Sequence, residues 1–238
     1  MDAALLEAEH AGVAFTVDSM LLARNKTHQA IRDIAARVQT GMLEEDVVAI
    51  AKKILVASGM ELSRQQTRVR FGRNTLKGMQ QASEPGMVLQ ENDIFFINVA
   101  ARHAGLQGKG GASFVVGRHP EYERCARDAE VLFHALRGMW LRMGLTGQEL
   151  HDYASKEARQ MGWELKLDWP GQHIAEFPRH MLHTGTLVDC PDAPTTMGYI
   201  LEVHLLDPQR RFGAFFEDML LDDSHYPLTI RSASDWSF

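Results

Sequence analysis

Apolar residues recur at helical spacing in two adjacent stretches near the start of the chain, Asn25 to Val38 and Met42 to Ser58. Thr40-Gly41 separates them, and Gly59 follows the second as a stop signal. Acidic residues open the second stretch and lysines lie toward its end, an order that the helix dipole favours. The pattern therefore predicts two helices joined by a short turn.

A second pair of helical patterns lies in the other half of the chain. Tyr122 to Met143 carries a long apolar stripe and is followed by Gly144. Another helix is predicted to begin at Thr146 and to stop at Gly162. The two halves thus each contain a helical hairpin.

Strand patterns follow each pair of helices. Asp93 to Ala100 and Ala112 to Val116 are dense apolar runs, and Ala101 to Gly105 is predicted as the turn region between them. Thr67 to Arg73 alternates basic and apolar residues, as expected of a half-buried strand, and Met87 to Leu89 is predicted as a short strand.

The second half closes on two more predicted strands. Tyr199 to Leu205 places Glu202 and His204 on one face of a strand, and Phe212 to Leu221 forms the next strand. The order of two helices followed by strands therefore occurs twice, which suggests a tandem pseudo-repeat. Residues 1–21 are predicted as an N-terminal arm, residues 22–221 as one domain, and residues 222–238 as a C-terminal tail.

Composition and charge narrow the function classes. The 238 residues carry a net charge of −6, which argues against nucleic acid as a partner because phosphate binding needs a basic face. Two cysteines are too few for a disulfide framework. The chain has no signal-peptide pattern and no apolar run long enough to span a bilayer. A cytoplasmic protein with a small-molecule substrate and no membrane association is expected.

Several short motifs occur in a fixed order over Leu22 to Leu221: RFGRNT, a hairpin ending FVVG, GxxIxxFP, an LE strand and GAFxED. Together they resemble the superfamily of methionine aminopeptidase, prolidase and creatinase. The resemblance implies the pita-bread fold, an α/β architecture in which helices flank a curved, mainly antiparallel sheet with pseudo-two-fold symmetry. It also implies a homodimer.

Active peptidases of this superfamily bind two metal ions through two Asp, one His and two Glu residues. Residue by residue, the resemblance places Asn98 and Lys109 at the Asp positions and Gln172, or the adjacent His173, at the His position. It places the two Glu ligands at Glu202 and Glu217.

The replaced ligands change the expected chemistry. An amide offers a metal only a neutral carbonyl, and a protonated lysine has no lone pair to offer. We therefore expect no metal cofactor; the alternative is a single weakly bound divalent ion held by Glu202, Glu217 and a histidine. The Lys109 ammonium is a candidate to occupy the place of the lost ion. Alternatively, Lys109 points into solvent from a glycine-rich turn.

Further candidates follow from the resemblance and from local composition. His173 and His180 are candidate acid/base residues, beside Glu202, Glu217 and Lys109 in catalytic roles. The candidate substrate-binding residues are Asn98, Gln172, Arg179, His183, Arg70 and His204.

Three functional hypotheses remain open. The first is a metal-independent enzyme that hydrolyses a C–N bond of a small amide, amidine or amino-acid-like molecule, as creatinase does. A role in a biosynthetic pathway is open under this hypothesis. The second is a non-catalytic pseudoenzyme that binds a ligand or partner. The third is an Xaa-Pro aminopeptidase-type metallopeptidase with a reduced metal site.

Overall fold

The computed structural model describes residues 16–63, 67–166, 171–174 and 185–225. Its long helices are α2 (Val17–Ala35), α3 (Glu44–Ala57), α4 (Pro120–Met143) and α5 (Gly147–Gln160). All four predicted helices are confirmed. Thr146 caps α5 through a capping box with Glu149, which fixes the start of that helix at its predicted position.

Helix α2 begins earlier than the sequence pattern indicated. It starts at Val17 rather than near Asn25, because the Thr16 side chain caps it by accepting a hydrogen bond from Ser19 N. The buried Met20 and Ala23 extend its apolar face. The helix therefore reaches into the segment 1–21 that was predicted as an arm.

The central hairpin consists of β3 (Asp93–His103) and β4 (Leu106–Val116). Only Ala104 and Gly105, with φ angles of 50° and 81°, lie between the strands. The predicted bounds were wrong here, since the turn is shorter and the second strand begins six residues before Ala112. The glycine-rich residues resembled a turn in the sequence, but they belong to β4.

The remaining long strands are β7 (Tyr199–Leu206) and β8 (Gly213–Met219), both close to prediction. Strand β2 (Arg68–Phe71) leads into the 3₁₀ helix η1 (Gly72–Leu76). The predicted strand Met87–Leu89 reduces to one bridge between Leu43 and Val88. Three very short strands were not predicted: β1 (Glu61–Leu62), β5 (Glu164–Leu165) and β6 (Gln172–His173).

The described strands form one sheet in the order β1-β3-β4-β8-β7-β5, with β2 paired to β3 and β6 paired to β7. Every pair is antiparallel. Two hairpins, β3–β4 and β7–β8, meet at the centre, and each follows its own pair of helices in the chain. This arrangement confirms the predicted order of elements.

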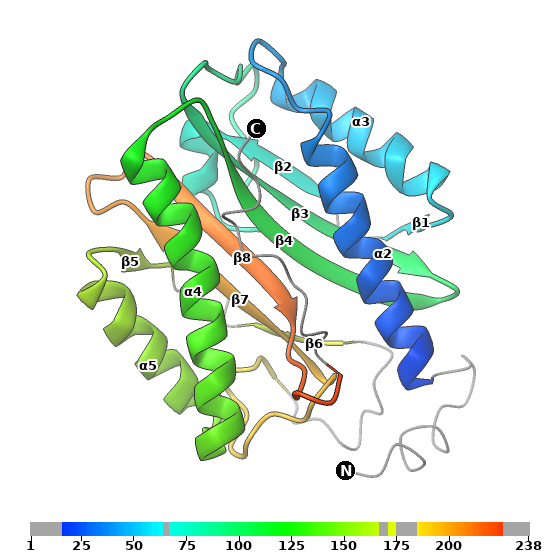
Figure 1. Cartoon of the computed structure of the whole chain (residues 1–238), viewed down its shortest axis with the longest axis vertical. Helices are drawn as coiled ribbons and strands as arrows, with labels where there is room; N and C mark the ends of the chain where they lie inside the picture. Colours follow the sequence, from blue (N-terminus) through cyan, green and yellow to red (C-terminus); the bar gives the residue numbers. More distant parts are fainter. Residues whose placement is uncertain (1–15, 64–66, 167–170, 175–184, 226–238) are drawn as a thin grey trace.

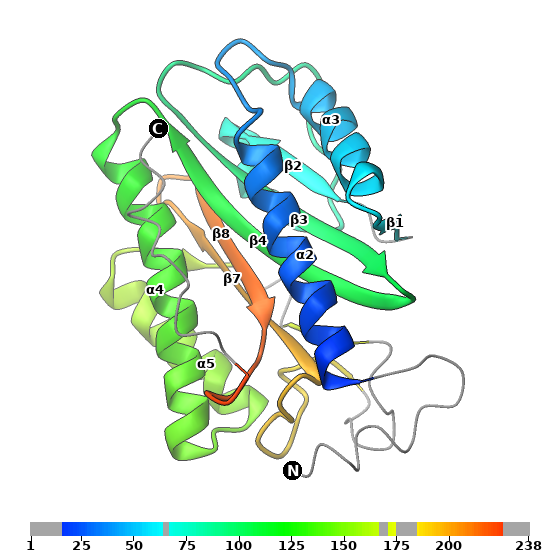
Figure 2. The ribbon, with the colours of Figure 1, turned by 45° about the vertical axis from the view of Figure 1, so that its right-hand side comes forward.

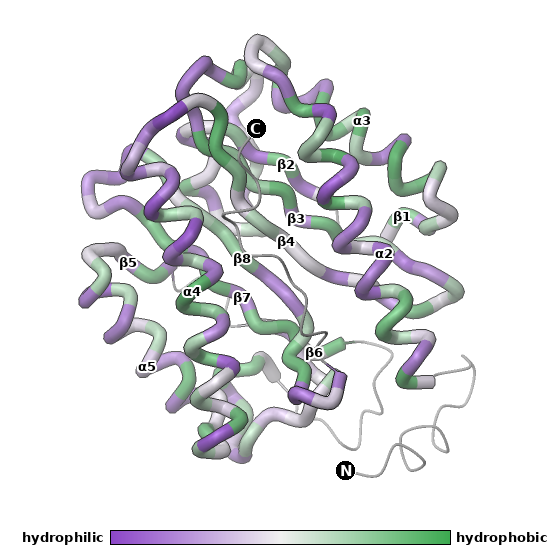
Figure 3. The backbone as a smooth tube through the Cα atoms, viewed as in Figure 1, coloured by the Kyte–Doolittle hydropathy of each residue, from purple (hydrophilic) through white to green (hydrophobic). Residues whose placement is uncertain are grey.

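The helices form a layer on one face of the sheet, where α2 lies over β3 and β4 and α4 lies over β7 and β8 (Figures 1 and 2). Figure 3 shows hydrophobic positions concentrated along the strands and alternating with polar positions along the helices. One hydrophobic cluster joins α4 and α5 to β7 and β8, and another joins α2 and α3 to β2 and β3. Within the described residues, none of the helices is both long and apolar enough to span a membrane.

Candidate functional site

Four strands bring the candidate site residues into one row across the sheet. Asn98 of β3 is the register partner of Gly111 of β4, and Gly111 is the partner of Glu217 of β8. Glu217 is in turn the partner of Glu202 of β7. Lys109 lies two residues from Gly111 on β4, so strand alternation places it on the same face as this row.

Hydrogen bonds join these side chains to one another. Asn98 Nδ2 donates to Glu217 Oε1 over 3.0 Å, and Glu217 shares a hydrogen bond with Glu202. Lys109 Nζ donates to Oε1 of Gln172 on β6 over 2.7 Å. Lys109 is 6 % exposed, so it does not extend into solvent from a turn. The structure thus brings together five of the predicted residues.

The surroundings of the two glutamates favour the protonated form of Glu202. Burial raises the pKa of Glu202 well above its ordinary value, and the neighbouring charge of Glu217 raises it further. The positive charge of Lys109 opposes this rise without cancelling it. Two carboxylates in direct contact cannot both ionise easily, which is why the charge of Glu217 favours a proton on Glu202.

One hydrogen-bond acceptor of the site has no donor among the described residues. Glu202 Oε2 is buried and has no hydrogen-bond partner among the described residues, although Glu202 as a whole is partly exposed. A buried, unpaired carboxylate oxygen is costly unless a water or ligand donates to it. The site therefore presents an ammonium group and an open acceptor at the pair of glutamates.

The donor set does not fit a dinuclear metal centre. At the two positions that the family resemblance assigns to metal-binding Asp residues, Asn98 turns its amide NH₂ toward Glu217 and Lys109 places an ammonium in the site. Two divalent ions need several anionic ligands, and an ammonium repels them. Over the described part of the chain, no group of three or more His, Cys, Asp or Glu side chains could hold a metal ion.

Two other predicted substrate-binding residues, His204 and Arg70, make hydrogen bonds and packing contacts within the fold. His204 is buried, its Nε2 lies 2.7 Å from Thr75 O, and its ring packs edge-on against Phe96 and Phe215. Arg70 is fully buried and donates to the carbonyl groups of Lys77 and Gln81. Both anchor the segment after β2, and their predicted substrate contacts stay predictions.

The predicted histidine segment lies largely outside the residues that the structure describes. Arg179, His180 and His183 fall outside the described residues, as does the His173 side chain. The backbone of β6 nevertheless settles one register question. Gln172 pairs with Ile200 and His173 with Tyr199, and it is Gln172 that contacts Lys109.

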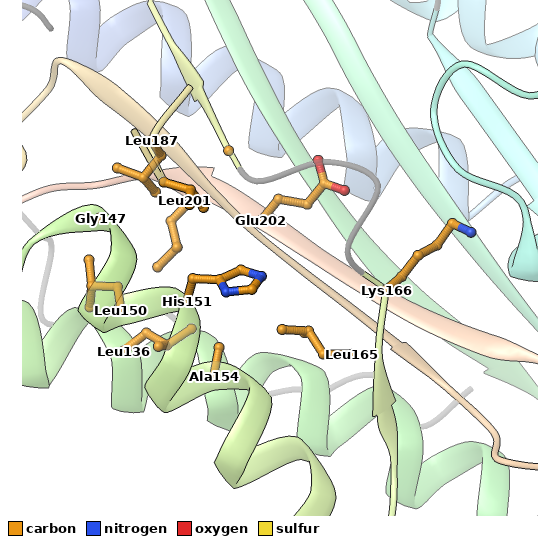
Figure 4. Close-up of a pocket in the computed structure, with 12 residues that line it drawn as sticks. Leu136, Gly147, Leu150, His151, Ala154, Leu165, Lys166, Leu187, Leu201 and Glu202 are labelled. Carbon is orange, nitrogen blue, oxygen red and sulfur yellow. The ribbon is translucent and has the colours of Figure 1, made fainter. Parts of the chain in front are cut away.

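A small pocket lies between α5 and the edge of β7 (Figure 4). Its volume is about 40 Å³, enough for a few water molecules. His151 extends from α5 into it among leucine side chains, and His151 Nδ1 is buried with no hydrogen-bond partner among the described residues. Glu202 also lines this pocket, although its carboxylate turns away from His151 in this view (Figure 4).

An ion-pair network on the opposite face of β8 was missed at the sequence level. Asp218 is fully buried, accepts hydrogen bonds from Arg24 Nε at 2.8 Å and Arg24 Nη2, and lies 2.9 Å from His28 Nε2. Two features of the sequence could have indicated this network. Strand alternation turns Asp218 away from Glu217 and toward the helices, and Arg24 and His28 lie one helical turn apart.

Comparisons with known proteins agree with this architecture. The model of metallopeptidase family M24 matches residues 18–221. No curated protein sequence matches the chain. An X-Pro aminopeptidase from Thermotoga maritima superimposes with a TM-score of 0.66 at 15% identity, over 87% of this chain and 60% of that one.

Two further solved structures are similar. A prolidase from Pyrococcus furiosus gives a TM-score of 0.68 at 13% identity, covering 92% of this chain and 64% of that one. A methionine aminopeptidase from Thermotoga maritima gives a TM-score of 0.62 at 14% identity, covering 84% of this chain and 90% of that one. The chain thus spans about three fifths of the first of these relatives, and at such identities the likeness establishes the shared pita-bread fold. Since the family model covers most of the sequence, the chain belongs to metallopeptidase family M24.

Proposed function

We propose that the chain is a metal-independent hydrolase that cleaves a C–N bond in a small amide, amidine or amino-acid-like molecule. The observation that carries this proposal is the hydrogen-bonded pair of Glu202 and Glu217 beside the Lys109 ammonium. The similar solved structures are named as an X-Pro aminopeptidase, a methionine aminopeptidase and a prolidase. Their scaffold is retained here, whereas the donor set for two metals is not.

One proton held by the glutamate pair supplies both halves of acid/base catalysis. The ionised glutamate takes a proton from a water molecule as the water oxygen bonds to the substrate carbon. The protonated glutamate delivers its proton to the leaving nitrogen as the C–N bond breaks. The pair therefore holds one proton before and after the reaction, and no external acid is needed.

Lys109 supplies the positive charge that two metal ions supply in other peptidases. Its ammonium is buried and held in place by Gln172, so it is pre-oriented toward negative charge that develops on the substrate oxygen. Asn98 holds Glu217 in position from the neighbouring strand. Glu202 Oε2 is free to accept a hydrogen bond from a substrate N–H group.

The test is hydrolysis of a panel of small amides, amidines and amino-acid amides. Release of amine or ammonia measures the hydrolysis, with and without a strong chelator. We expect turnover that the chelator leaves unchanged and that falls at least about 100-fold in Glu202→Gln, the usual scale of acid/base catalysis. Lys109→Met should lower turnover with the fold retained.

Two results would overturn the proposal. Turnover that appears only with added divalent ions would favour the metallopeptidase with a reduced site. Ligand binding without turnover of any panel member, and unchanged by Glu202→Gln, would favour a non-catalytic binding protein.

A further inference from the structure

Helix α2 packs on β4 directly behind Lys109. Gly108 and Gly110 flank this lysine, and both turn their missing side chains toward α2. A Cβ atom at Gly108 would lie 2.1 Å from Thr27 Oγ1 and 2.7 Å from Ala23 O, so only glycine allows the observed contact. A Cβ atom at Gly110 would meet Thr27 and Ile31 at 3.5 Å, an ordinary van der Waals distance.

The same helix also holds the strand that carries Glu217. Arg24 and His28 of α2 both contact Asp218, the residue after Glu217, in a fully buried cluster. Strand alternation turns Asp218 to the helix face and Glu217 to the site face. One helix therefore contacts β4 and β8 immediately behind the two oppositely charged groups of the site.

We propose that α2 is the positioning element of the site, and that Gly108, Arg24 and Asp218 are positioning residues that set the distance between Lys109 and the Glu202–Glu217 pair. The inference rests on the proposed function, because it takes those three side chains as the reacting groups.

The physical reason is the short backbone pairing between the two hairpins. The register that joins β4 to β8 is defined at a single pair, Gly111 and Glu217, whereas β3–β4 and β7–β8 are paired along their length. Hydrogen bonds between the Ser113 hydroxyl of β4 and the backbone of Phe215 on β8 add to this junction. Helix α2 contacts both hairpins from behind and so fixes their spacing at the level of the charged groups, and the field of a charge depends directly on its distance.

The matched variants Gly108→Ala and Gly110→Ala test this inference. Both add one methyl group beside Lys109 on the face that α2 covers, but only the first collides with the backbone of α2. The measured quantity is the pH midpoint at which the Glu202–Glu217 pair loses its proton, in the full chain without substrate. The infrared band of the protonated carboxyl group monitors this titration. The Glu202→Gln variant assigns that band.

We expect Gly108→Ala to shift this midpoint and Gly110→Ala to leave it at the native value. If Gly108→Ala does not fold, Asp218→Asn provides a second test, with Asp207→Asn as its control. Asp207 also accepts hydrogen bonds from an arginine, Arg211, but at the far end of the β7–β8 hairpin. Circular dichroism identifies the variants that retain the fold.

A Gly108→Ala protein and an Asp218→Asn protein that melt at lower temperature but keep the native midpoint would overturn the inference, since α2 would then contribute stability alone. Equal shifts in the control variants would overturn it as well. The titration needs no turnover, so a shifted midpoint in a protein without hydrolytic activity would retain the positioning role and reject the proposed function.

Discussion

Glu202 and Glu217 are register partners on adjacent strands and share a hydrogen bond on the face of the sheet away from the helices. The family resemblance implies that the corresponding pair in the active peptidases binds metal. In this chain the positive charge of Lys109 acts on Glu202. Burial and the charge of Glu217 raise the pKa of Glu202, and the ammonium of Lys109 opposes that rise.

Restoring the two lost carboxylates should restore metal binding. The double variant Asn98→Asp/Lys109→Asp adds a negative charge at one position and exchanges a positive for a negative charge at the other. We expect it to bind Mn²⁺ or Co²⁺ and to melt at higher temperature with added ion, because a ligand that binds only the folded state stabilises it by about 2.7 kcal/mol at 100 times its Kd.

Elemental mass spectrometry after dialysis and a thermal melt measure this effect. Asn98→Leu/Lys109→Met is the matched control, since it removes the ammonium without adding carboxylates. Metal uptake by the control equal to that of the Asp variant would show that Lys109 does not stand where an ion is bound.

The raised pKa of Glu202 predicts a stability that falls as pH rises. The unfolded residue ionises near its ordinary pKa of 4.5, and the folded residue ionises at higher pH. Between these two values the folded state binds more protons than the unfolded state, so the free energy of unfolding decreases with increasing pH. Glu202→Gln resembles the protonated form and should lose this dependence.

Urea unfolding between pH 4 and pH 9 measures the difference between the native protein and Glu202→Gln. We expect the variant to be the relatively more stable protein at the alkaline end of this range and the two to converge toward pH 4. A difference that stays constant with pH would mean that Glu202 is ionised throughout.

Asp218 should show the opposite pH dependence. Burial raises its pKa, but His28 and Arg24 outweigh burial and hold the pKa of Asp218 well below its ordinary value of 3.8. Its contribution to stability is therefore complete above about pH 4 and is lost as pH falls below that value. Asp218→Asn should remove about 3–5 kcal/mol of unfolding free energy at pH 7, since it leaves Arg24 buried without its anion.

Denaturant unfolding at pH 7 and pH 3 measures this contribution. Asp207→Asn, which affects a pair with a half-exposed arginine, should cost clearly less at pH 7. Equal losses from the two substitutions would mean that the burial of the Arg24–Asp218 pair has no energetic consequence.

The sequence predicted the helices and the long strands because their apolar spacing and their caps are local signals. It failed on β4, where glycines that resemble a turn instead allow α2 to approach the strand. That contact depends on residues far apart in the chain. The row of Asn98, Lys109, Gln172, Glu202 and Glu217 was predicted from family motifs, whereas periodicity alone gives no register between β4 and β8.

The Arg24–Asp218 pair shows why the rest of the site could not be predicted. Asp218 follows a candidate catalytic residue in the sequence, and an acidic residue at that point has no local signature of burial. Only the packing of α2 on β8 brings Arg24 to it. His151 is similar, since one histidine in an amphipathic helix does not reveal that its Nδ1 is enclosed by leucines.

Two histidines should respond in opposite ways to replacement by leucine. The His151 side chain is 25% exposed. Its buried Nδ1 makes no hydrogen bond within the part of the chain that the structure describes, and Asp152 Oδ1 lies 3.8 Å away. His151→Leu removes an unsatisfied polar atom from an apolar pocket, so the free energy of unfolding should stay within about 1 kcal/mol of native or rise. His204→Leu leaves Thr75 O without its hydrogen bond in a buried site and should cost about 1–3 kcal/mol.

Urea unfolding of both variants at pH 8 makes the comparison, because both substitutions exchange the same ring for the same alkyl group. Hydrolysis of the amide panel by His151→Leu should equal native turnover, since His151 lies on the helix side of β7 and the Glu202 carboxylate turns away from it. A large loss of stability in His151→Leu would show that His151 Nδ1 is hydrogen-bonded to a water held in the pocket. A loss of turnover without a loss of stability would instead place this pocket within the catalytic site.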